Sequence, residues 1–376
     1  MIKLSHSKLG CILSCPMTYH LNYELGIAKK VEKPALAIGS AVHWGIEHST
    51  EDLTEYFTQN STIKSRNDYT RDQMLAESMV HGYMKHKDEI FEEMLRNNET
   101  GEKYELVDET HELYTTGELH SSATNLTHKF VGIIDLLLLT NKGFIVIDYK
   151  TSSMTPDWSK YLDQIYRYIF MLKTTFPDIP IIKIGIINIR KTSIRQKKNE
   201  NVEQFFNRMK FEYDVNDENY VNYHEYSIDA LNPQLIEDYT TSLSRQCDLA
   251  QMIVDNHVRF INFAAAEGQY GKSDYWEIFH RIPDCHLLYS ISDHIWNEES
   301  QGFDNRRDCV PLDMKCIDDV LLLNKYNIFV DELDSYEGSD FMGYLHKKYE
   351  IDEDLLSQYV KTHEMAQKMQ ISLRNL

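Results

Sequence analysis

The stretch "FIVIDYKTSS", residues 144–153, ends an apolar run with a carboxylate and an amine two residues apart. Phe144 to Ile147 are apolar without a break, which is typical of a strand buried on both faces. Side chains two residues apart on a strand point to the same side. Asp148 and Lys150 therefore project together while Tyr149 faces away, and this end of the strand is a candidate site.

The preceding segment "KFVGIIDLLLLT" (129–140) predicts a second strand, and residues 141–143 form a tight turn between the two. The hairpin folds Asp135 back toward Asp148, because cross-strand neighbours lie ~5 Å apart. Two carboxylates this close repel each other unless a cation lies between them. Mg²⁺ or Mn²⁺ takes such oxygen ligands, and Lys150 beside the ion can orient or deprotonate a water. The pattern predicts metal-assisted phosphodiester hydrolysis.

Each element of this pattern also has a simpler interpretation. An Asp-x-Lys pair on a strand is usually a surface ion pair, and Asp135 alone can be a hydrogen-bonded core aspartate. The combination is more specific, because it requires two apolar strands, a short hairpin and a carboxylate at a set depth in each.

The surrounding sequence predicts an α/β fold with a mixed central sheet flanked by helices. The hairpin is followed by a helix and another strand, which together give a mixed sheet with helical cover. The further strands are expected at 104–116 and 181–189, with a polar hairpin tip at 119–128. Helical periodicity covers 4–25 (broken at Pro16), 35–57, 70–98, 157–176 and 232–266.

Four motifs resemble a known family. "GIID" (132–135), twelve residues, then "DYK" (148–150) resembles the core of the PD-(D/E)XK nuclease superfamily, which has a restriction-endonuclease-like fold. "LSHSKLGCILSCPMTYHLNY" (4–23), "GSAVH" (39–43) and "QIYRY" (164–168) resemble its RecB-like exonuclease branch, as in CRISPR-associated adaptation nucleases and phage exonucleases. The resemblance covers about residues 4–190, half the chain.

The resemblance implies a role for each matching position. His43, Asp135 and Asp148 would bind the metal together with the Tyr149 carbonyl, and Lys150 would be the catalytic lysine. Taken alone, His43 would by default be a hydrogen-bonded helix histidine, and it is the resemblance that makes it a metal ligand.

Gln164 and Tyr168 are one helical turn apart, and by the same resemblance they line the site or contact the DNA backbone. Tyr168 is explained nearly as well as a core residue, because it shares an apolar stripe with Tyr161, Ile165 and Leu172.

The segment "RKTSIRQKK" (190–198) carries five cations in nine residues on a chain whose net charge is −20. The cations are Arg190, Lys191, Arg195, Lys197 and Lys198. A charge run is usually a solvated loop, but its place after the fourth strand, near the catalytic edge, favours contacts with DNA phosphates.

Composition bounds the remaining questions. No stretch approaches the roughly 18 apolar residues of a membrane span, and the six cysteines include no CxxC pair, so we expect reduced thiols in a cytoplasm, bacterial or phage-infected. Relatives with an iron–sulfur cluster use one N-terminal and three clustered C-terminal cysteines. The spacing of Cys285, Cys309 and Cys316 departs from that, so we expect no cluster.

We expect a nuclease domain over 1–283 with a helical insertion at about 44–103, then an acidic accessory segment over 284–376. That segment has 19 acidic and 9 basic residues, a net charge of −10, and is a candidate surface for a protein partner. The predicted function is a Mg²⁺- or Mn²⁺-dependent DNA exonuclease of recombination, repair or phage DNA processing. The alternatives are a nuclease subunit active only in a larger complex and a catalytically idle DNA- or protein-binding module.

Overall fold

The computed structural model describes residues 2–24, 27–29, 33–60, 69–153, 157–215, 217–266, 273–280, 289–291, 294–297 and 302–305. The chain forms two compact units. The first comprises Met1–Leu13 and Val31–His257, and the second comprises Ser14–Lys30 and Val258–Leu376. The expected boundary at 283/284 stays a prediction, because most of the acidic segment lies outside the described residues.

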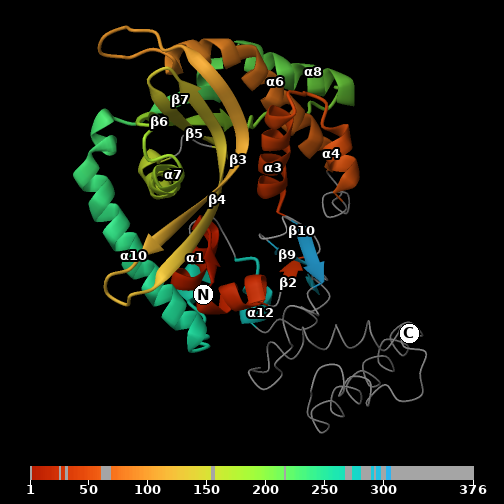
Figure 1. Cartoon of the computed structure of the whole chain (residues 1–376). Coiled ribbons are helices and arrows are strands. Elements are labelled where there is room, and N and C mark those ends of the chain that lie inside the picture. The colour runs from red at the N-terminus through yellow and green to blue at the C-terminus, as the bar shows by residue number, and fades with distance from the viewer. Residues whose placement is uncertain are drawn as a thin grey trace, which may run out of the picture. The chain divides into compact units, whose positions relative to one another are not determined.

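The first unit is built on a six-stranded mixed sheet, which confirms the predicted α/β fold (Figure 1). Its order is β1-β4-β5-β6-β7, with β3 paired to β4 off this path. The β1/β4 and β5/β6 pairs are parallel, and the other pairs are antiparallel. The strands are β1 (Lys3–Leu4), β3 (Leu106–His120), β4 (Thr127–Thr140), β5 (Gly143–Ser152), β6 (Ile181–Arg190) and β7 (Val221–Glu225).

The β4–β5 turn lies where the sequence predicts it. Pairing runs from Thr140 opposite Gly143 to Leu136 opposite Ile147. Gly143 has φ of 144°, and a Cβ there would lie 2.2 Å from the Pro180 carbonyl oxygen. Only glycine fits this position, so the turn fixes the register that carries Asp135 and Asp148.

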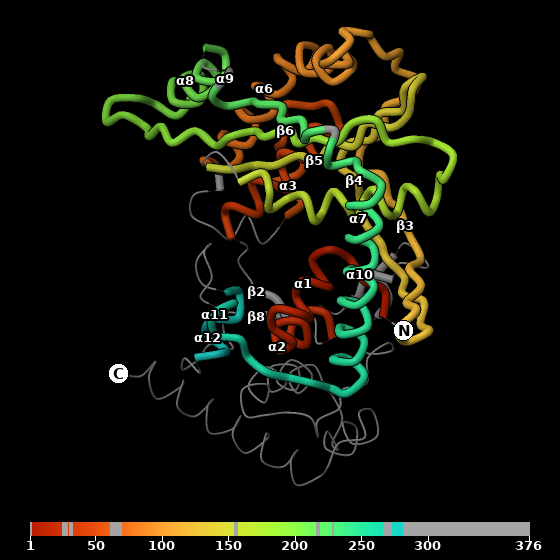
Figure 2. The backbone as a smooth tube through the Cα atoms, turned by 90° about the vertical axis from the view of Figure 1, so that its left-hand side faces the viewer, coloured from red at the N-terminus to blue at the C-terminus, as the bar shows by residue number. Residues whose placement is uncertain are grey.

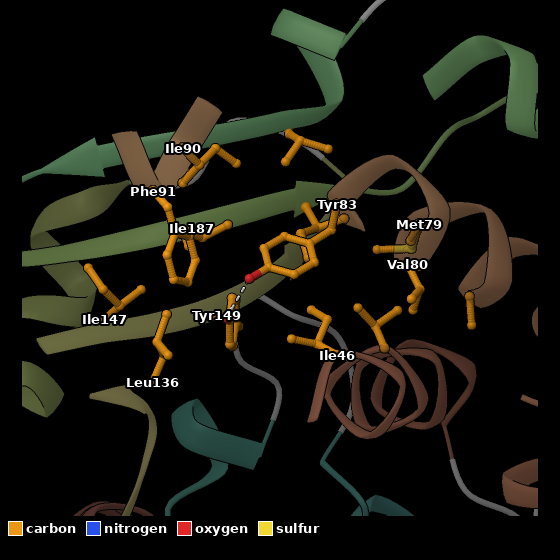
Figure 3. Close-up of a cluster of buried hydrophobic side chains, with 14 of the residues drawn as sticks. Ile46, Met79, Val80, Tyr83, Ile90, Phe91, Leu136, Ile147, Tyr149 and Ile187 are labelled. Atoms are coloured by element: carbon orange, nitrogen blue, oxygen red, sulfur yellow. Dashed lines mark hydrogen bonds between the residues drawn. The ribbon is translucent and has the colours of Figure 1, made fainter. Parts of the chain in front are cut away.

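Helices α3 (Pro34–Glu47) and α6 (Tyr69–Met94) cover one face of the sheet. Figure 3 shows side chains of both helices, among them Ile46 and Val80, in one cluster with Leu136 and Ile147 of the sheet. These residues are all buried. The apolar face of α3 therefore anchors the helix that carries His43.

Helix α7 (Leu162–Thr175) packs against β3, β4 and β5 and contacts Asp148 and Lys150. The buried guanidinium of Arg167 fixes it: it donates to the Asp163 carboxylate at 2.7 Å, to the His6 carbonyl at 3.1 Å and to the Tyr239 hydroxyl at 3.2 Å. Tyr239 belongs to α10 (Pro233–Asp255), which also runs beside the far end of the β3–β4 hairpin (Figures 1 and 2).

Two helices are shorter than the segments whose apolar periodicity predicts them. The helix expected over 35–57 ends at Glu47 and resumes as α4 (Thr54–Gln59). Between them Ser49 is left-handed (φ 49°), and the Asp52 side chain accepts from the Thr54 amide. These local hydrogen bonds compete with the helix ladder. The helix expected over 232–266 likewise ends at Asp255.

The other elements follow in chain order. They are α1 (His6–Ser14), α2 (Pro16–Tyr19), a π-helix (His20–Glu24), β2 (Ile27–Lys29), 3₁₀ turns at Trp158–Tyr161 and Ile228–Leu231, α8 (Val202–Val215), α9 (Asp217–Tyr220), α11 (Phe263–Ala266), α12 (Trp276–Phe279), β8 (Tyr289–Ile291), β9 (His294–Asn297) and β10 (Gly302–Asn305). The predicted break at Pro16 is confirmed, whereas α8 and β7 were not predicted. In the part of the chain that the structure describes, no helix has the length and apolar character needed to cross a membrane.

Candidate active site

Asp148, Lys150, Gln164 and Tyr168 form one hydrogen-bonded group. The Lys150 ammonium forms an ion pair with the buried Asp148 carboxylate and donates to Gln164 Oε1 at 3.1 Å. Gln164 Nε2 lies 3.0 Å from Asp148 Oδ1 and 2.5 Å from the Tyr168 hydroxyl. The two strand residues and the two helix residues singled out in the sequence therefore lie in contact.

Tyr168 is both a core residue and a site residue, the two interpretations that the sequence offered. It is 5% exposed, so it belongs to the core, yet its hydroxyl contacts Gln164 inside the site. Burial, and next the negative charge of Asp148, raise the pKa of Tyr168 far above its ordinary value. The phenol stays protonated and acts as a neutral hydrogen-bonding group.

A second group comprises His43, Glu112 and Asp135. His43 Nδ1 lies 3.7 Å from Glu112 Oε1 and 3.8 Å from Asp135 Oδ2. One ligand atom from each residue lies within 4.8 Å of the others, and this is the set of metal-ligating side chains that the described residues bring together. Burial alone lowers the pKa of His43, but Glu112 and Asp135 outweigh it and the net shift is upward.

Asp135 links the two groups. Its Oδ2 accepts from the Tyr149 backbone amide at 2.7 Å, and the register places it opposite Asp148, one step past the last β4–β5 pair. Burial, and next the charge of Asp148, raise the pKa of Asp135 to about 7. A buried carboxyl whose pKa is raised by a neighbouring carboxylate is a candidate ligand for a cation.

The side chain of Tyr149 points away from the site, as strand alternation predicts. Its hydroxyl is hydrogen-bonded to that of Tyr83 at 2.9 Å (Figure 3), and its ring packs edge-on against the His43 imidazole at 5.9 Å. Tyr149 therefore helps to hold His43 in place, while metal binding by its carbonyl stays a prediction.

Glu112 is the site residue that the sequence did not reveal. It lies on β3 between the Leu113–Ile134 and His111–Leu136 pairs, directly opposite Asp135. Its backbone is left-handed, with φ of 47°, a conformation that costs a residue with a side chain roughly 1–2 kcal/mol. Strain of this kind concentrates at functional sites.

The donor set suits a hard divalent cation. Carboxylate oxygens from Glu112, Asp135 and Asp148 suit Mg²⁺ or Mn²⁺, and one imidazole shifts the preference toward Mn²⁺. None of the three cysteines that the structure describes is part of a disulfide. Cys285, Cys309 and Cys316 lie outside the described residues.

The basic stretch begins beside the catalytic strand, with Arg190 paired to Ser152. Arg190 Nε donates to the Ser153 carbonyl at 3.3 Å and Lys191 Nζ to that of Ala35 at 2.9 Å. Burial lowers the pKa of Lys191, so this lysine has a structural role. Arg195, Lys197 and Lys198 are exposed.

A mixed α/β sheet with an Asp…Asp-x-Lys hairpin and a Gln-bearing helix behind it defines a nuclease-type core. The chain matches the PD-(D/E)XK nuclease superfamily over residues 3–263 and belongs to that superfamily. This confirms the resemblance at the level of the superfamily. Membership indicates a metal-dependent nuclease that binds nucleic acid.

No curated protein gives a significant match. Among solved structures, the chain is similar to a candidate exonuclease from Eubacterium rectale, with 11% identity and a TM-score of 0.42, over 69% of this chain and 89% of that one. It is also similar to SSO0001, with 16% identity and a TM-score of 0.20, over 48% and 84% respectively.

Proposed function

We propose that the chain is a Mg²⁺- or Mn²⁺-dependent deoxyribonuclease, an exonuclease acting on single strands or duplex ends. The observation that carries the proposal is the convergence of Lys150, Gln164 and the buried Asp148 with Asp135 and His43. Neither a surface ion pair nor an isolated core aspartate explains it, because four elements contribute to one site.

We assign the metal to His43, Asp135 and Asp148, with Glu112 as an additional candidate ligand. When bound, a divalent cation would polarise the scissile phosphate and lower the pKa of an attacking water. His43 is held for this role by the ring of Tyr149, and Asp135 by the Tyr149 amide.

Lys150 would handle the attacking water. Its ammonium is fixed by Asp148 and Gln164 and lies 5.1 Å from the centre of the Tyr161 ring. From this position the ammonium can orient a water. Once it has released a proton to solvent, the neutral amine can accept the proton of the attacking water. The side-chain amide of Gln164 would hold Asp148 and Lys150 in place by bonding to both.

The test is cleavage of linear, circular and single-stranded DNA by the purified chain with Mg²⁺ or Mn²⁺. Asp148→Asn and Lys150→Met should each lower the rate at least about 100-fold, because metal and proton-transfer contributions are worth several kcal/mol. Lys142→Met, at the exposed β4–β5 turn, is the matched control. Near wild-type rates in both site variants would refute the assignment, and cutting of circular DNA would refute an exonuclease.

The finer assignment to the RecB-like branch, and to recombination, repair or phage DNA processing, rests on the N-terminal, GSAVH and QIYRY motifs. The net charge of −10 over 284–376 favours one second candidate, a nuclease subunit that docks a protein partner through this segment. An isolated chain that binds Mn²⁺ but does not cut DNA would favour that candidate.

A further inference from the structure

The sheet face that carries the catalytic pair continues across two more strands. Asp148 is in register with Ile186 on β6, and Ile186 with His224 on β7. Residues in register share a face, and adjacent strands are 4.7–4.9 Å apart. His224 therefore lies on the same side of the sheet as Asp148, roughly 10 Å away along the strand-pairing direction.

Three aromatic rings gather at this point. The Trp158 and His224 rings are stacked, with centroids 4.5 Å apart and planes 8° apart. Tyr226 packs edge-on against His224 at 5.2 Å, and its hydroxyl donates to the Trp158 carbonyl at 2.6 Å. The hydrogen bond and the stacking fix Trp158, which begins the short turn leading into α7, against the β7 strand.

The three rings are only partly buried, and β7 is the last strand on its side of the sheet. They differ in this from the core aromatic residues between the sheet and α6. Burial lowers the pKa of His224, so the imidazole is neutral at pH 7 and stacks as an uncharged ring. Two exposed charges nearby, Asp157 and Lys160, are paired with each other at 3.8 Å. The surface itself is formed by aromatic rings.

This chemistry suits the flat face of a nucleobase better than a phosphate. Aromatic side chains beside a backbone-binding site hold single strands without sequence preference, because every base has a π-face. Bases inside a duplex are already stacked on both faces and cannot use such a surface.

We propose that Trp158, His224 and Tyr226 form a base-stacking platform that holds single-stranded DNA while its phosphate enters the Asp148–Lys150 site. The inference rests on the proposed nuclease function and adds a substrate class to it: an unpaired strand, bound through its bases as well as its backbone. The platform sets affinity for the strand, and the catalytic group sets the rate of cleavage.

Binding by the full chain is measured in an Asp148→Asn background, so that the DNA stays intact. The probes are a single-stranded oligonucleotide and an abasic one of equal length and charge. Trp158→Leu should weaken binding of the normal strand about 5- to 100-fold and leave the abasic strand unaffected. Trp158→Phe, which keeps an aromatic face, should recover most of the loss.

Trp276→Leu is the matched control, because Trp276 is stacked on His280 in the same way, at 4.3 Å and 23°, but belongs to the second unit. Equal losses on normal and abasic strands, or no loss in Trp158→Leu, overturn the platform while the nuclease assignment stands. A parent protein that does not bind single strands overturns the platform, and one that, with Asp148 restored, cuts neither single strands nor duplex ends overturns the nuclease assignment as well.

Discussion

Glu112 is a strand residue in a left-handed backbone conformation, within 3.7 Å of His43. If its carboxylate completes the metal site, Glu112→Gln should weaken Mn²⁺ binding about tenfold or more, since removing one charged oxygen ligand costs more than about 1.4 kcal/mol. Isothermal titration with Mn²⁺ measures this directly. An unchanged affinity would assign Glu112 to the orientation of His43 alone.

The same residue offers a test of stored strain. Glu112→Gly removes the carboxylate but suits φ of 47°, so it should raise the melting temperature of the metal-free protein while weakening Mn²⁺ binding. Glu118→Gln, an exposed position on the same strand, should alter neither quantity. A loss of stability in Glu112→Gly would mean that the side chain is needed for packing.

The raised pKa of Asp135 predicts that the stability of the metal-free protein depends on pH. Its pKa is raised from 3.8 to about 7, so the fold prefers the protonated carboxyl and loses stability as pH rises through that interval. Asp135→Asn is neutral at every pH. With a chelator present it should melt several degrees above wild type at pH 8 and show a smaller difference at pH 5.

Excess Mn²⁺ provides the internal control for Asp135. Ligand binding stabilises the folded state, so Mn²⁺ should raise the melting temperature of wild type and leave Asp135→Asn nearly unchanged. A melting difference that does not vary with pH would show that folding does not raise the pKa of Asp135.

How far sequence determines this site depends on the residue. Strand alternation alone predicts that Asp148 and Lys150 point to the same side, whereas the place of Gln164 was expected only from the family resemblance. Glu112 could not be predicted, because its role arises from a left-handed backbone and from its place opposite Asp135. Trp158 and His224 likewise could not be paired from the sequence, because they meet only in the folded chain and β7 has no strong apolar pattern of its own.

At the scale of elements, one carboxylate joins the far end of the β3–β4 hairpin to α10. Asp248 accepts hydrogen bonds from Ser121 and Thr124, both at 2.6 Å, and from the fully buried His128 at 2.8 Å. Asp248→Ala leaves these donors without their partner and should cost about 2–5 kcal/mol of unfolding free energy in urea. Asp238→Ala, on the same helix and bonded only at the surface, should cost far less.

The pH dependence of this effect has a definite sign. Burial raises the pKa of Asp248, but its three hydrogen bonds outweigh that and lower it below 3.8. Its stabilisation is therefore present above the ordinary pKa and lost as pH falls through the folded value. The difference between wild type and Asp248→Ala should be full at pH 6 and shrink toward pH 3. A constant difference would exclude the charged form as its cause.

The elements that the sequence predicted well are those with a long apolar repeat or a turn that admits only glycine. The β4–β5 hairpin has both, and its turn lies where the sequence predicts it. The 35–57 segment has helical periodicity throughout, yet Thr50 and Asp52 offer the backbone local hydrogen bonds that end the helix. Periodicity does not report this competition, so the helix boundary was wrong.

At the scale of the whole molecule, a chain with a net charge of −20 must bind nucleic acid through a local group of cations. Arg195, Lys197 and Lys198 remain exposed after Arg190 and Lys191 have bonded to backbone carbonyls. If the three contact phosphates of a single strand, each contributes about −0.7 to the slope of log K against log salt. Neutralising all three to Gln should flatten that slope by about 2 and weaken binding of every sequence alike.

The control for this last prediction must carry the same change in net charge. Lys103, Lys129 and Lys142 are exposed and lie near surface carboxylates, and replacing them with Gln also moves the formal charge from −20 to about −23. A general effect of charge would weaken binding in both triple variants, whereas phosphate contacts change the slope only in the first. Mn²⁺ affinity should be the same in both, because neither set touches the metal site. Equal slopes would make residues 195–198 a solvated loop and require other cations to bind the DNA backbone.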